Sequence, residues 1–338
     1  MMAQGLGPNL ASRLSDVTLE KCADVGLAYA QDNRHVPGQS IRKLSEAFQE
    51  RSLDSAIVMA AGPSLHRNNV AEQIKASGFE GLIISSESAM AYCFRNGLVP
   101  DVIVTLDPHS KRIVRFFGDP DLTAGDLEAD DYFRRQDLDP ALRENELKRN
   151  QDLLEAVDAH GPTIRAAVAS CASPPVVQRC RDSGMDIYWW NPLYDDPMEP
   201  ESVTRQVYDI NGYPCVNAGG NVGTACWVLA HSILEIQKIA LVGMDLSYYE
   251  DTDHINTQYY YELVDLVGED RVAEAFIDIE NPYLGKTWFT DPTYYWYRDV
   301  FLEMAADAPC ITYNCTEGGI LFGDGVVFTT LAKFLSNH

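Results

Sequence analysis

The sequence is short of positive charge, because 26 Lys and Arg residues stand against 50 Asp and Glu residues and leave a formal net charge of −24. Such an acidic chain repels the phosphates of nucleic acids and of anionic membranes, so we expect neither as a partner. The same charge opposes any anionic ligand. A ligand of that kind needs backbone N–H groups, a local Arg or Lys, or a divalent cation, for which Mg²⁺ is the candidate.

Long apolar runs and closely paired cysteines are also missing. No segment reaches the roughly 18 uninterrupted apolar residues of a membrane span, and residues 1–26 lack a basic region followed by an apolar stretch. We therefore expect a cytoplasmic protein. The eight cysteines form no C-x-x-C pair and most lie in apolar runs, which predicts buried free thiols and neither a zinc site nor disulfides.

Short apolar runs that alternate with helix-like stretches predict the fold. They indicate an α/β, Rossmann-like protein with a mostly parallel sheet flanked by helices. The predicted strands are Ala56–Ala60, Gly81–Ser85, Asp101–Leu106, Thr163–Ala169, Asp186–Trp190, Lys238–Val242 and Cys310–Asn314.

Two regions are expected along the chain, a short N-terminal helical lead-in (1–51) and a Rossmann-like nucleotide-binding catalytic domain (52–338). Insertions in the second are predicted near 118–160, 191–214 and 251–292, since these segments exceed the usual connection of about 2–6 residues. Such segments serve as lids, substrate contacts or oligomer contacts. Aromatic residues in the segments 191–214 and 251–292 also suggest a homo-oligomer.

Three glycine-containing loops each follow an apolar run, and we interpret them as one ligand site. Gly62, Pro63 and Ser64 form a strand-to-helix corner, where the Ser64 hydroxyl is expected to cap the next helix. A strand that ends at Gly243 delivers the carboxylate of Asp245. In doubly wound sheets, ligands bind beyond the carboxyl ends of the strands.

The segment 217–224 is the strongest single signal, because glycines and asparagines gather just before an apolar helix and form a plausible anion cradle. It has neither the Lys-Ser/Thr of a P-loop nor the G-x-G-x-x-G spacing, so its pattern does not identify ATP or NAD. The candidate nucleotide-binding residues in it are Asn217, Gly219, Gly220, Asn221, Gly223 and Thr224.

Several polar residues after predicted strands are further candidates. Asp107 is suited to ribose hydroxyls or a metal ion, or alternatively to capping the turn that follows it. Asn314, Thr316 and Glu317 either read a base or sugar edge or form a plain exit from a strand. His254, nine positions after Asp245, is a candidate proton acceptor, and His109 competes for that role.

Taken together, these motifs in this order and spacing, over about residues 55–320, resemble the central domain of the motility-associated-factor family of proposed flagellin glycosyltransferases. That domain is shared with MptE-like 6-hydroxymethylpterin pyrophosphokinases. The resemblance implies a sialyltransferase-like fold and a CMP-activated nonulosonic acid, a CMP-sugar, as donor. It further implies that the loops at 62–65 and 217–224 hold the nucleotide, while Asp107 and Asp245 orient ribose, phosphate or a cation.

Three functions stay open at this point. The first is an inverting glycosyltransferase that transfers the sugar to a hydroxyl of a protein or glycan, flagellin included, with His254 as base and Asp245 as the other catalytic residue. The second is an ATP-dependent 6-hydroxymethylpterin diphosphokinase, in which aromatic side chains at 188–190 or 294–296 stack on the pterin. The third is a noncatalytic nucleotide-binding or sugar-binding protein.

Overall fold

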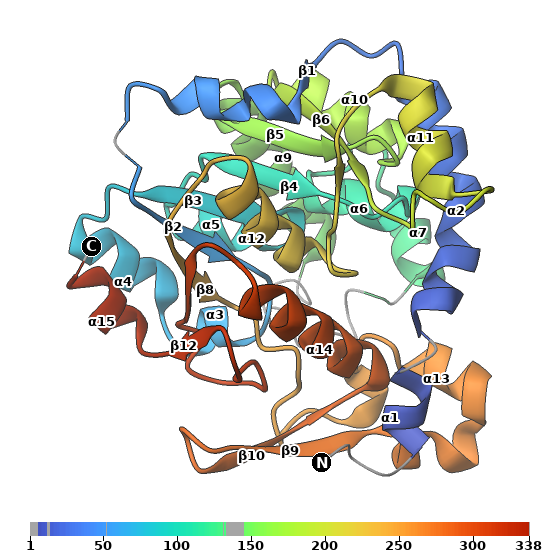
Figure 1. Ribbon diagram of the computed structural model, residues 1–338, viewed down its shortest axis with the longest axis vertical. Helices are drawn as coiled ribbons and strands as arrows, with labels where there is room; N and C mark the ends of the chain where they lie inside the picture. Colours follow the sequence, from blue (N-terminus) through green and yellow to red (C-terminus); the bar gives the residue numbers. More distant parts are fainter. Residues whose placement is uncertain (1–5, 12–13, 52, 131, 133–144, 338) are drawn as a thin grey trace.

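The chain forms a central parallel sheet with helices on both faces (Figure 1). The computed structural model describes residues 6–11, 14–51, 53–130, 132 and 145–337. Part of the predicted insertion at 118–160, residues 131 and 133–144, therefore lies outside the described residues. The predicted α/β class with a mostly parallel sheet is confirmed.

The sheet has ten strands, and every strand pairing described in it is parallel. In spatial order the strands are β1 (Gln39–Ser40), β6 (Asp186–Pro192), β5 (Arg165–Ala169), β4 (Val102–Thr105), β3 (Leu82–Ser86), β2 (Ser55–Met59), β8 (Lys238–Val242), β11 (Ile311–Asn314) and β12 (Val326–Phe328), with β7 (Cys215–Val216) paired to β6. All seven predicted strands are present, with small shifts at their ends.

Helices connect most of these strands. They are α1 (Leu6–Ala11), α2 (Leu14–Asn33), α3 (Ser64–Arg67), α4 (Val70–Ser77), α5 (Glu87–Arg95), α6 (Ser110–Phe116), α7 (Ala124–Ala129), α9 (Glu146–His160), α10 (Pro174–Asp182), α11 (Val203–Asn211), α12 (Val222–Ser232), α13 (Tyr260–Val267), α14 (Pro292–Ala306) and α15 (Leu331–Leu335), with 3-10 segments η1 (Ile41–Phe48), η3 (Gly161–Thr163), η4 (His254–Asn256) and η5 (Glu269–Ala275). No helix of the described part is long and apolar enough to cross a membrane.

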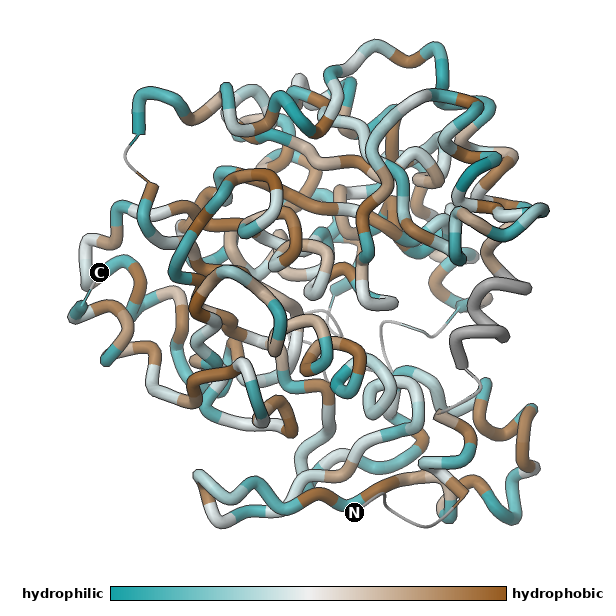
Figure 2. Tube along the Cα trace, viewed as in Figure 1, coloured by the Kyte–Doolittle hydropathy of each residue, from teal (hydrophilic) through white to brown (hydrophobic). Residues whose placement is uncertain are grey.

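Side chains of the central strands alternate between two cores, as the pleat of a strand requires. Ala56 and Val58 of β2 pack with α12 and α14 on one face, whereas Ile57 and Met59 pack with α4, α5 and α15 on the other. Figure 2 shows hydrophobic strands in the middle of the molecule and more hydrophilic segments around them. The sheet is therefore buried on both faces, which explains why its strands have continuous apolar runs.

The N-terminal region contains helices and also contributes a strand to the sheet. Helix α2 is present, but β1 pairs with β6 and so joins the central sheet. Ile41, Leu44 and Phe48 of the 3-10 segment η1 pack into the main core. The spacing of these three apolar residues places them on one face of the segment, and their burial holds residues 39–48 against the sheet.

The predicted insertion at 251–292 contains a second, two-stranded sheet. Strands β9 (Ile277–Asn281) and β10 (Lys286–Thr290) form an antiparallel hairpin, and the helix α13 precedes it along the chain. Figure 1 shows this hairpin with α13 and α1 at one end of the molecule, beyond the end of β8. These elements form a cap on the side of the sheet where the strands end.

The eight cysteines are free, as predicted. Five are buried, and burial raises the pKa of the Cys93, Cys171 and Cys180 thiols to about 12. Three others, Cys22, Cys215 and Cys310, are only half-buried, which differs from the expectation of uniform burial. The raised pKa keeps the buried thiols protonated, and they pack as small apolar side chains.

Candidate functional site

The order of strands changes direction between β2 and β8. From β2 the chain proceeds through β3, β4 and β5 to β6 on one side, and then returns to β8 on the other side of β2 and continues to β11 and β12. Such a change of direction marks the usual ligand position in doubly wound sheets, and we call the edge of the sheet at the ends of β2 and β8 the crevice between β2 and β8. Both the 62–65 corner and Asp245 lie at this crevice.

Asp245 connects the two loops. The Ser64 hydroxyl donates a hydrogen bond of 2.7 Å to Asp245 Oδ2, and the Gly62 amide donates one of 2.8 Å to the Gly243 carbonyl. Asp245 is 2% exposed and Ser64 is fully buried. The predicted capping role of Ser64 is wrong: α3 begins at Ser64 with Pro63 as N-cap and no side-chain cap bond, because the hydroxyl is used on Asp245.

A second glycine loop packs against Asp245 from β11. A Cβ atom added at Gly319 would lie 2.2 Å from the Asp245 carbonyl oxygen, so only glycine allows this approach. The Asp245 carbonyl also accepts a hydrogen bond from the Ile320 amide. Asp245 thus holds the loops after β2, β8 and β11 together.

The predicted cradle at 217–224 lies beside the same crevice. Gly219 and Gly220 have φ values of +57° and +81°, in the left-handed region that favours glycine. Asn221 is the N-cap of α12, and its Oδ1 accepts a 2.9 Å hydrogen bond from the Thr224 amide. A Cβ at Gly223 would lie 2.8 Å from Met244 Sδ, which places the first turn of α12 directly against the end of β8.

Within this cradle, the polar side chains mainly shape the loop. Asn217 accepts a hydrogen bond from the Gly219 amide, and the Asn221 side-chain amide donates to Thr224 Oγ1. Thr224 is fully buried, whereas Asn217 and Gly220 are exposed. Backbone amides and the helix N-terminus are therefore the groups suited to an anion here.

Asp107 follows β4 at the same edge of the sheet and is exposed. Its Oδ1 accepts a 2.7 Å hydrogen bond from the His109 amide, so the turn-capping alternative is what the structure shows. His109 is the N-cap of α6, and its Nδ1 accepts from the Arg112 amide, which assigns the ring proton to Nε2. Both residues are used in the turn and keep exposed atoms toward solvent.

Asn314, Thr316 and Glu317 support the loop after β11. Asn314 is fully buried, donates to the Leu321 carbonyl and accepts from the Thr316 amide. Thr316 Oγ1 accepts from the Met244 amide, and Glu317 Oε1 accepts from the Leu331 amide. The two predicted alternatives were contacts to a base or sugar and a plain turn at the end of a strand. These hydrogen bonds favour the second, because the side chains hold the turn after β11 in place.

His254 lies in the cap beyond the sheet. Its ring stacks on Phe276 at a centroid distance of 4.0 Å and meets Phe289 of β10 edge-on at 5.1 Å. Burial lowers the pKa of His254, against the opposing effect of the Asp278 and Asp253 carboxylates. The imidazole is therefore neutral at neutral pH, which is the form that accepts a proton.

The expectation that Mg²⁺ binds at Asp107 and Asp245 stays a prediction. Among the described residues, no three His, Cys, Asp or Glu side chains form a metal-binding group. Asp245 is buried and accepts from Ser64 through Oδ2, so Oδ1 is its oxygen for a cation. The exposed Asp107 carboxylate fits a Mg²⁺ ion held chiefly by substrate phosphates.

Glu87 is a residue of this edge that the sequence analysis missed. It is the first residue of α5, immediately after β3, and is 3% exposed. Its Oε2 has no hydrogen-bond partner in the structure. Burial raises the pKa of Glu87 to about 8, and the negative charge of Asp107 adds to that shift. A protonated carboxylic acid therefore lies under the ligand edge at neutral pH.

This protonation predicts a pH-dependent difference in stability. Between about pH 4.5 and pH 8 the folded chain keeps a proton on Glu87 that the unfolded chain has released, so stability falls as pH rises through this window. Glu87→Gln cannot ionise, so we expect its stability advantage over the wild type to grow with pH. Urea unfolding at several pH values measures this difference in the free energy of unfolding, with a substitution of an exposed glutamate, Glu128→Gln, as control. A difference between Glu87→Gln and the wild type that does not change with pH would contradict a protonated Glu87.

A tyrosine cluster faces the crevice from the cap and from α14. Tyr259 and Tyr297 share a 3.2 Å hydrogen bond, and the Tyr248 hydroxyl donates a 2.6 Å bond to Asp291. A Cβ at Gly220 would lie 2.7 Å from the Tyr297 ring, so α14 closes directly over the 217–224 loop. The aromatic run 294–297 is thus near the crevice.

The other aromatic run, Tyr188, Trp189 and Trp190, lies in β6 and is at most 4% exposed. It belongs to the core, so its predicted alternative role in stacking on a pterin is wrong. Both aromatic runs lie near candidate site segments along the chain. The sequence therefore did not show which of them is in the core and which is near the crevice.

Comparison with known proteins agrees with part of this arrangement. Residues 28–122, which include the 62–65 corner and Asp107, match the family described as 6-hydroxymethylpterin diphosphokinase MptE-like. No curated protein matches the chain. A solved structure with a similar fold is the MAf glycosyltransferase from Magnetospirillum magneticum AMB-1, at a TM-score of 0.55 and 15% sequence identity.

That structural match covers 92% of this chain and 39% of the glycosyltransferase chain. At this identity it establishes the fold, and the predicted Rossmann-like architecture is confirmed. The resemblance to both protein groups, stated above from the motifs, is also confirmed. The chain therefore has the α/β fold of a MAf glycosyltransferase and, over residues 28–122, the sequence features of the MptE-like family.

Proposed function

We propose that this chain is a transferase that binds a nucleotide-activated donor in the crevice between β2 and β8. The observation that carries the proposal is the junction at Asp245, where the Ser64 hydroxyl is 2.7 Å from Asp245 Oδ2 and the glycine loop after β11 packs on the Asp245 backbone. The glycine loop before α12 lies beside this junction. Loops that are fixed in this way can bind a phosphate through their backbone N–H groups, so that a cluster of basic side chains is not needed.

The donor that we propose is a CMP-activated nonulosonic acid. The glycosyltransferase fold supports a sugar donor, and the chain's net charge of −24 favours recognition of the phosphate through amides and helix N-termini. The acceptor is a hydroxyl of a protein or glycan, with flagellin as one candidate. Asp107, exposed at the edge of the sheet, is suited to the ribose hydroxyls or to Mg²⁺ bound to the phosphate.

His254 is the proposed base. It removes the proton of the acceptor hydroxyl, the resulting oxygen attacks the anomeric carbon, and the bond from that carbon to the phosphate oxygen breaks as CMP leaves with the electron pair. Burial lowers the pKa of His254 and so supplies the neutral imidazole that this step needs. Amides of the 217–224 loop stabilise the negative charge of the leaving phosphate.

The experiment is a transfer assay with a CMP-activated nonulosonic acid and candidate protein and glycan acceptors, with release of CMP as readout. We expect CMP release that depends on the acceptor. Release of AMP from ATP with 6-hydroxymethyl-dihydropterin, and no release of CMP, would favour the second candidate instead.

That second candidate is a 6-hydroxymethylpterin diphosphokinase, and the match of residues 28–122 to the MptE-like family is the observation that favours it. In this reaction the pterin alcohol oxygen attacks the β-phosphorus of ATP and AMP leaves. Tyr294 and Trp296 are half-buried beside the crevice and offer rings for stacking. The two candidates share the same crevice and differ in the nucleotide that it holds.

A further inference from the structure

The indole of Trp296, in α14, lies against the glycine loop that precedes α12. A Cβ atom added at Gly220 would lie 2.8 Å from Trp296 Cζ3 and 2.9 Å from Trp296 Cη2, so the edge of the six-membered ring contacts this loop. Trp296 is half-buried. The other four tryptophans of the chain are at most 4% exposed; they are Trp189, Trp190, Trp227 and Trp288. Trp296 is therefore the tryptophan whose ring a ligand at the loop can reach.

The tyrosines on either side of Trp296 are held by the protein itself. The Tyr294 hydroxyl donates a 2.6 Å hydrogen bond to Gln258, and the Tyr297 hydroxyl shares a 3.2 Å hydrogen bond with Tyr259. Both rings pack against the main core. The Trp296 ring lies beside that of Tyr297, at a centroid distance of 5.3 Å, and so rests on a fixed wall.

The same loop offers backbone N–H groups to an anion. Among the described residues, no hydrogen bond involves the amides of Gly220, Val222 and Gly223. They belong to the loop and to the first turn of the eleven-residue α12, where the helix dipole favours a negative charge. A phosphate at these amides would lie next to the Trp296 ring, because Gly220 contacts that ring.

A buried polar group without a partner lies beside the start of α12. Glu87 is 3% exposed, and its Oε2 makes no hydrogen bond within the described structure. Burial raises the pKa of Cys226, in the second turn of α12, and the nearby Glu87 carboxyl adds to that shift, so this carboxyl faces the helix. An unsatisfied buried group of this kind is typical of a functional site.

Asp107 lies near the same part of α14. Burial raises the pKa of Tyr297, and the negative charge of Asp107 adds to this shift. Tyr297 directly follows Trp296, so the carboxylate suited to ribose hydroxyls, the amides suited to phosphate and the indole all lie around the 217–224 loop. A nucleotide carries its base and its phosphate on one ribose, and one such ligand therefore matches all three groups.

We propose that the Trp296 indole stacks on the base of the nucleotide whose phosphate binds the amides of the 217–224 loop. The inference rests on the proposed function, since it takes the donor to be a nucleotide, and it names the residue that holds the base. Stacking on an indole needs a flat ring and no particular set of hydrogen-bond donors and acceptors, so cytosine and adenine both fit. Trp296 is a binding residue and takes no part in the chemical step.

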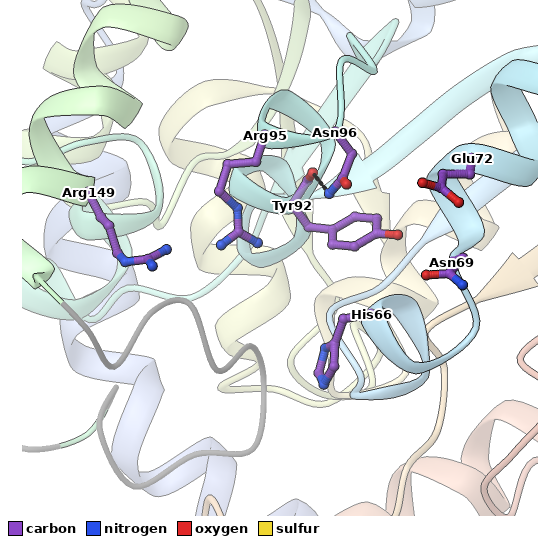
Figure 3. A pocket seen from close by; sticks show the side chains of 7 residues that line it. All are labelled: His66, Asn69, Glu72, Tyr92, Arg95, Asn96 and Arg149. Atoms are coloured by element: carbon purple, nitrogen blue, oxygen red, sulfur yellow. Dashed lines mark hydrogen bonds between the residues drawn. The ribbon is translucent and has the colours of Figure 1, made fainter.

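A different cleft, of about 280 Å³ among α3, α4, α5 and α9, is lined by the side chains labelled in Figure 3. Its tyrosine, Tyr92, is 8% exposed, and the Tyr92 hydroxyl donates a 2.9 Å hydrogen bond to the Leu65 carbonyl. This ring is packed into the protein and offers little surface to a base. Binding in that cleft would not respond to a change at Trp296, which is not one of its lining residues.

The test is titration of the full chain with CMP, with AMP and with ribose 5-phosphate, which lacks a base. Because the other tryptophans are buried, we expect CMP to change the intrinsic tryptophan fluorescence and ribose 5-phosphate to leave it nearly unchanged. Calorimetry should show that CMP binds about fivefold to 100-fold more tightly than ribose 5-phosphate, the range for stacking of one base on an aromatic ring.

Variants of Trp296 separate stacking from a structural effect. Trp296→Leu should weaken CMP binding to about the affinity of ribose 5-phosphate and leave the affinity of ribose 5-phosphate unchanged, whereas a disrupted loop would lose both ligands. Trp296→Phe keeps a ring and should retain most of the preference for CMP. The matched control is Tyr295→Leu, because Tyr295 is half-buried on the same helix and its ring is not one of those nearest to Gly220. This variant should bind like the wild type.

The outcomes distinguish the stacking from the proposed function. Equal affinity of the wild type for CMP, AMP and ribose 5-phosphate, or a preference for CMP that survives Trp296→Leu, would overturn the stacking and leave the donor crevice standing. A preference for AMP that depends on Trp296 would support the stacking and contradict the CMP-sugar donor. Binding of none of the three ligands would contradict both the stacking and the proposed function.

Discussion

Gly62→Ala is expected to destabilise the protein by about 3 kcal/mol, at the upper end of the range for overpacking a dense interior. The added Cβ would lie 2.0 Å from Asp245 Oδ2 and 2.5 Å from the Gly243 carbonyl oxygen, and one of these neighbours is backbone. The loops after β2 and β8 must therefore separate, and nucleotide binding should be lost with them. Thermal and urea unfolding measure the first effect, and calorimetry measures the second.

The matched control is Gly125→Ala. Gly125 lies within α7, and the nearest atom to its added Cβ is Thr123 Oγ1 at 3.6 Å, which is ordinary contact. Alanine in a helix is favoured over glycine by about 0.5–1 kcal/mol, so this variant should be as stable as the wild type or more stable. Equal stability of the Gly62 and Gly125 variants would contradict the tight junction at Asp245.

His254→Ala is expected to lower kcat for sugar transfer by about 100-fold to 10,000-fold, the usual contribution of a general base. Donor binding should change little, because the residue lies in the cap and not in the 62–65 or 217–224 loops. The lost stacking on Phe276 also removes some stability, so unfolding curves accompany the kinetics. The kcat for donor hydrolysis and for transfer should be measured separately.

His109→Ala is the control for this assignment. His109 is exposed and caps α6, so its loss should affect the α6 turn while transfer persists. If His254→Ala retains full activity and His109→Ala loses it, His109 is the base. The fold and the donor crevice would stand in either case.

Much of the crevice could be predicted from the sequence, and the reason is geometric. The parallel sheet brings the carboxyl ends of its strands to one edge, so the glycine loops at 62–65, at 217–224 and after Gly243 were expected to meet there. Asp245 joins the first and the last of them, and the loop after β11 packs on it as well. The apolar runs of these strands are continuous because both faces are buried, which made their ends easy to locate. The change of strand order between β2 and β8 required the structure.

Other features depend on tertiary contacts. Glu87 reads in the sequence as an ordinary acidic residue at a helix start, and only the packing around it shows that it is buried and protonated. Ser64 has the sequence pattern of a helix cap, but its hydroxyl donates to the Asp245 carboxylate and makes no capping hydrogen bond to α3. The β9–β10 hairpin did leave a signal, since Ile277 and Ile279 alternate with acidic residues in the period of a strand.

The division at residue 51 stays a prediction, although residues 39–48 pack against the main sheet. The region contains α2 and the 3-10 segment η1, whose apolar residues are spaced three and four apart, a pattern shared with an α-helix. The pairing of β1 with β6 involves two residues and has no sequence signature of its own.

Calorimetric titration of the full chain with CMP and with ATP, each with and without Mg²⁺, tests most directly whether the crevice between β2 and β8 binds the nucleotide of an activated sugar. We expect one CMP per chain and much weaker binding of ATP, with CMP binding lost in Gly62→Ala. Binding of neither nucleotide would contradict the crevice as a donor site, and selective binding of ATP would contradict the CMP-sugar donor.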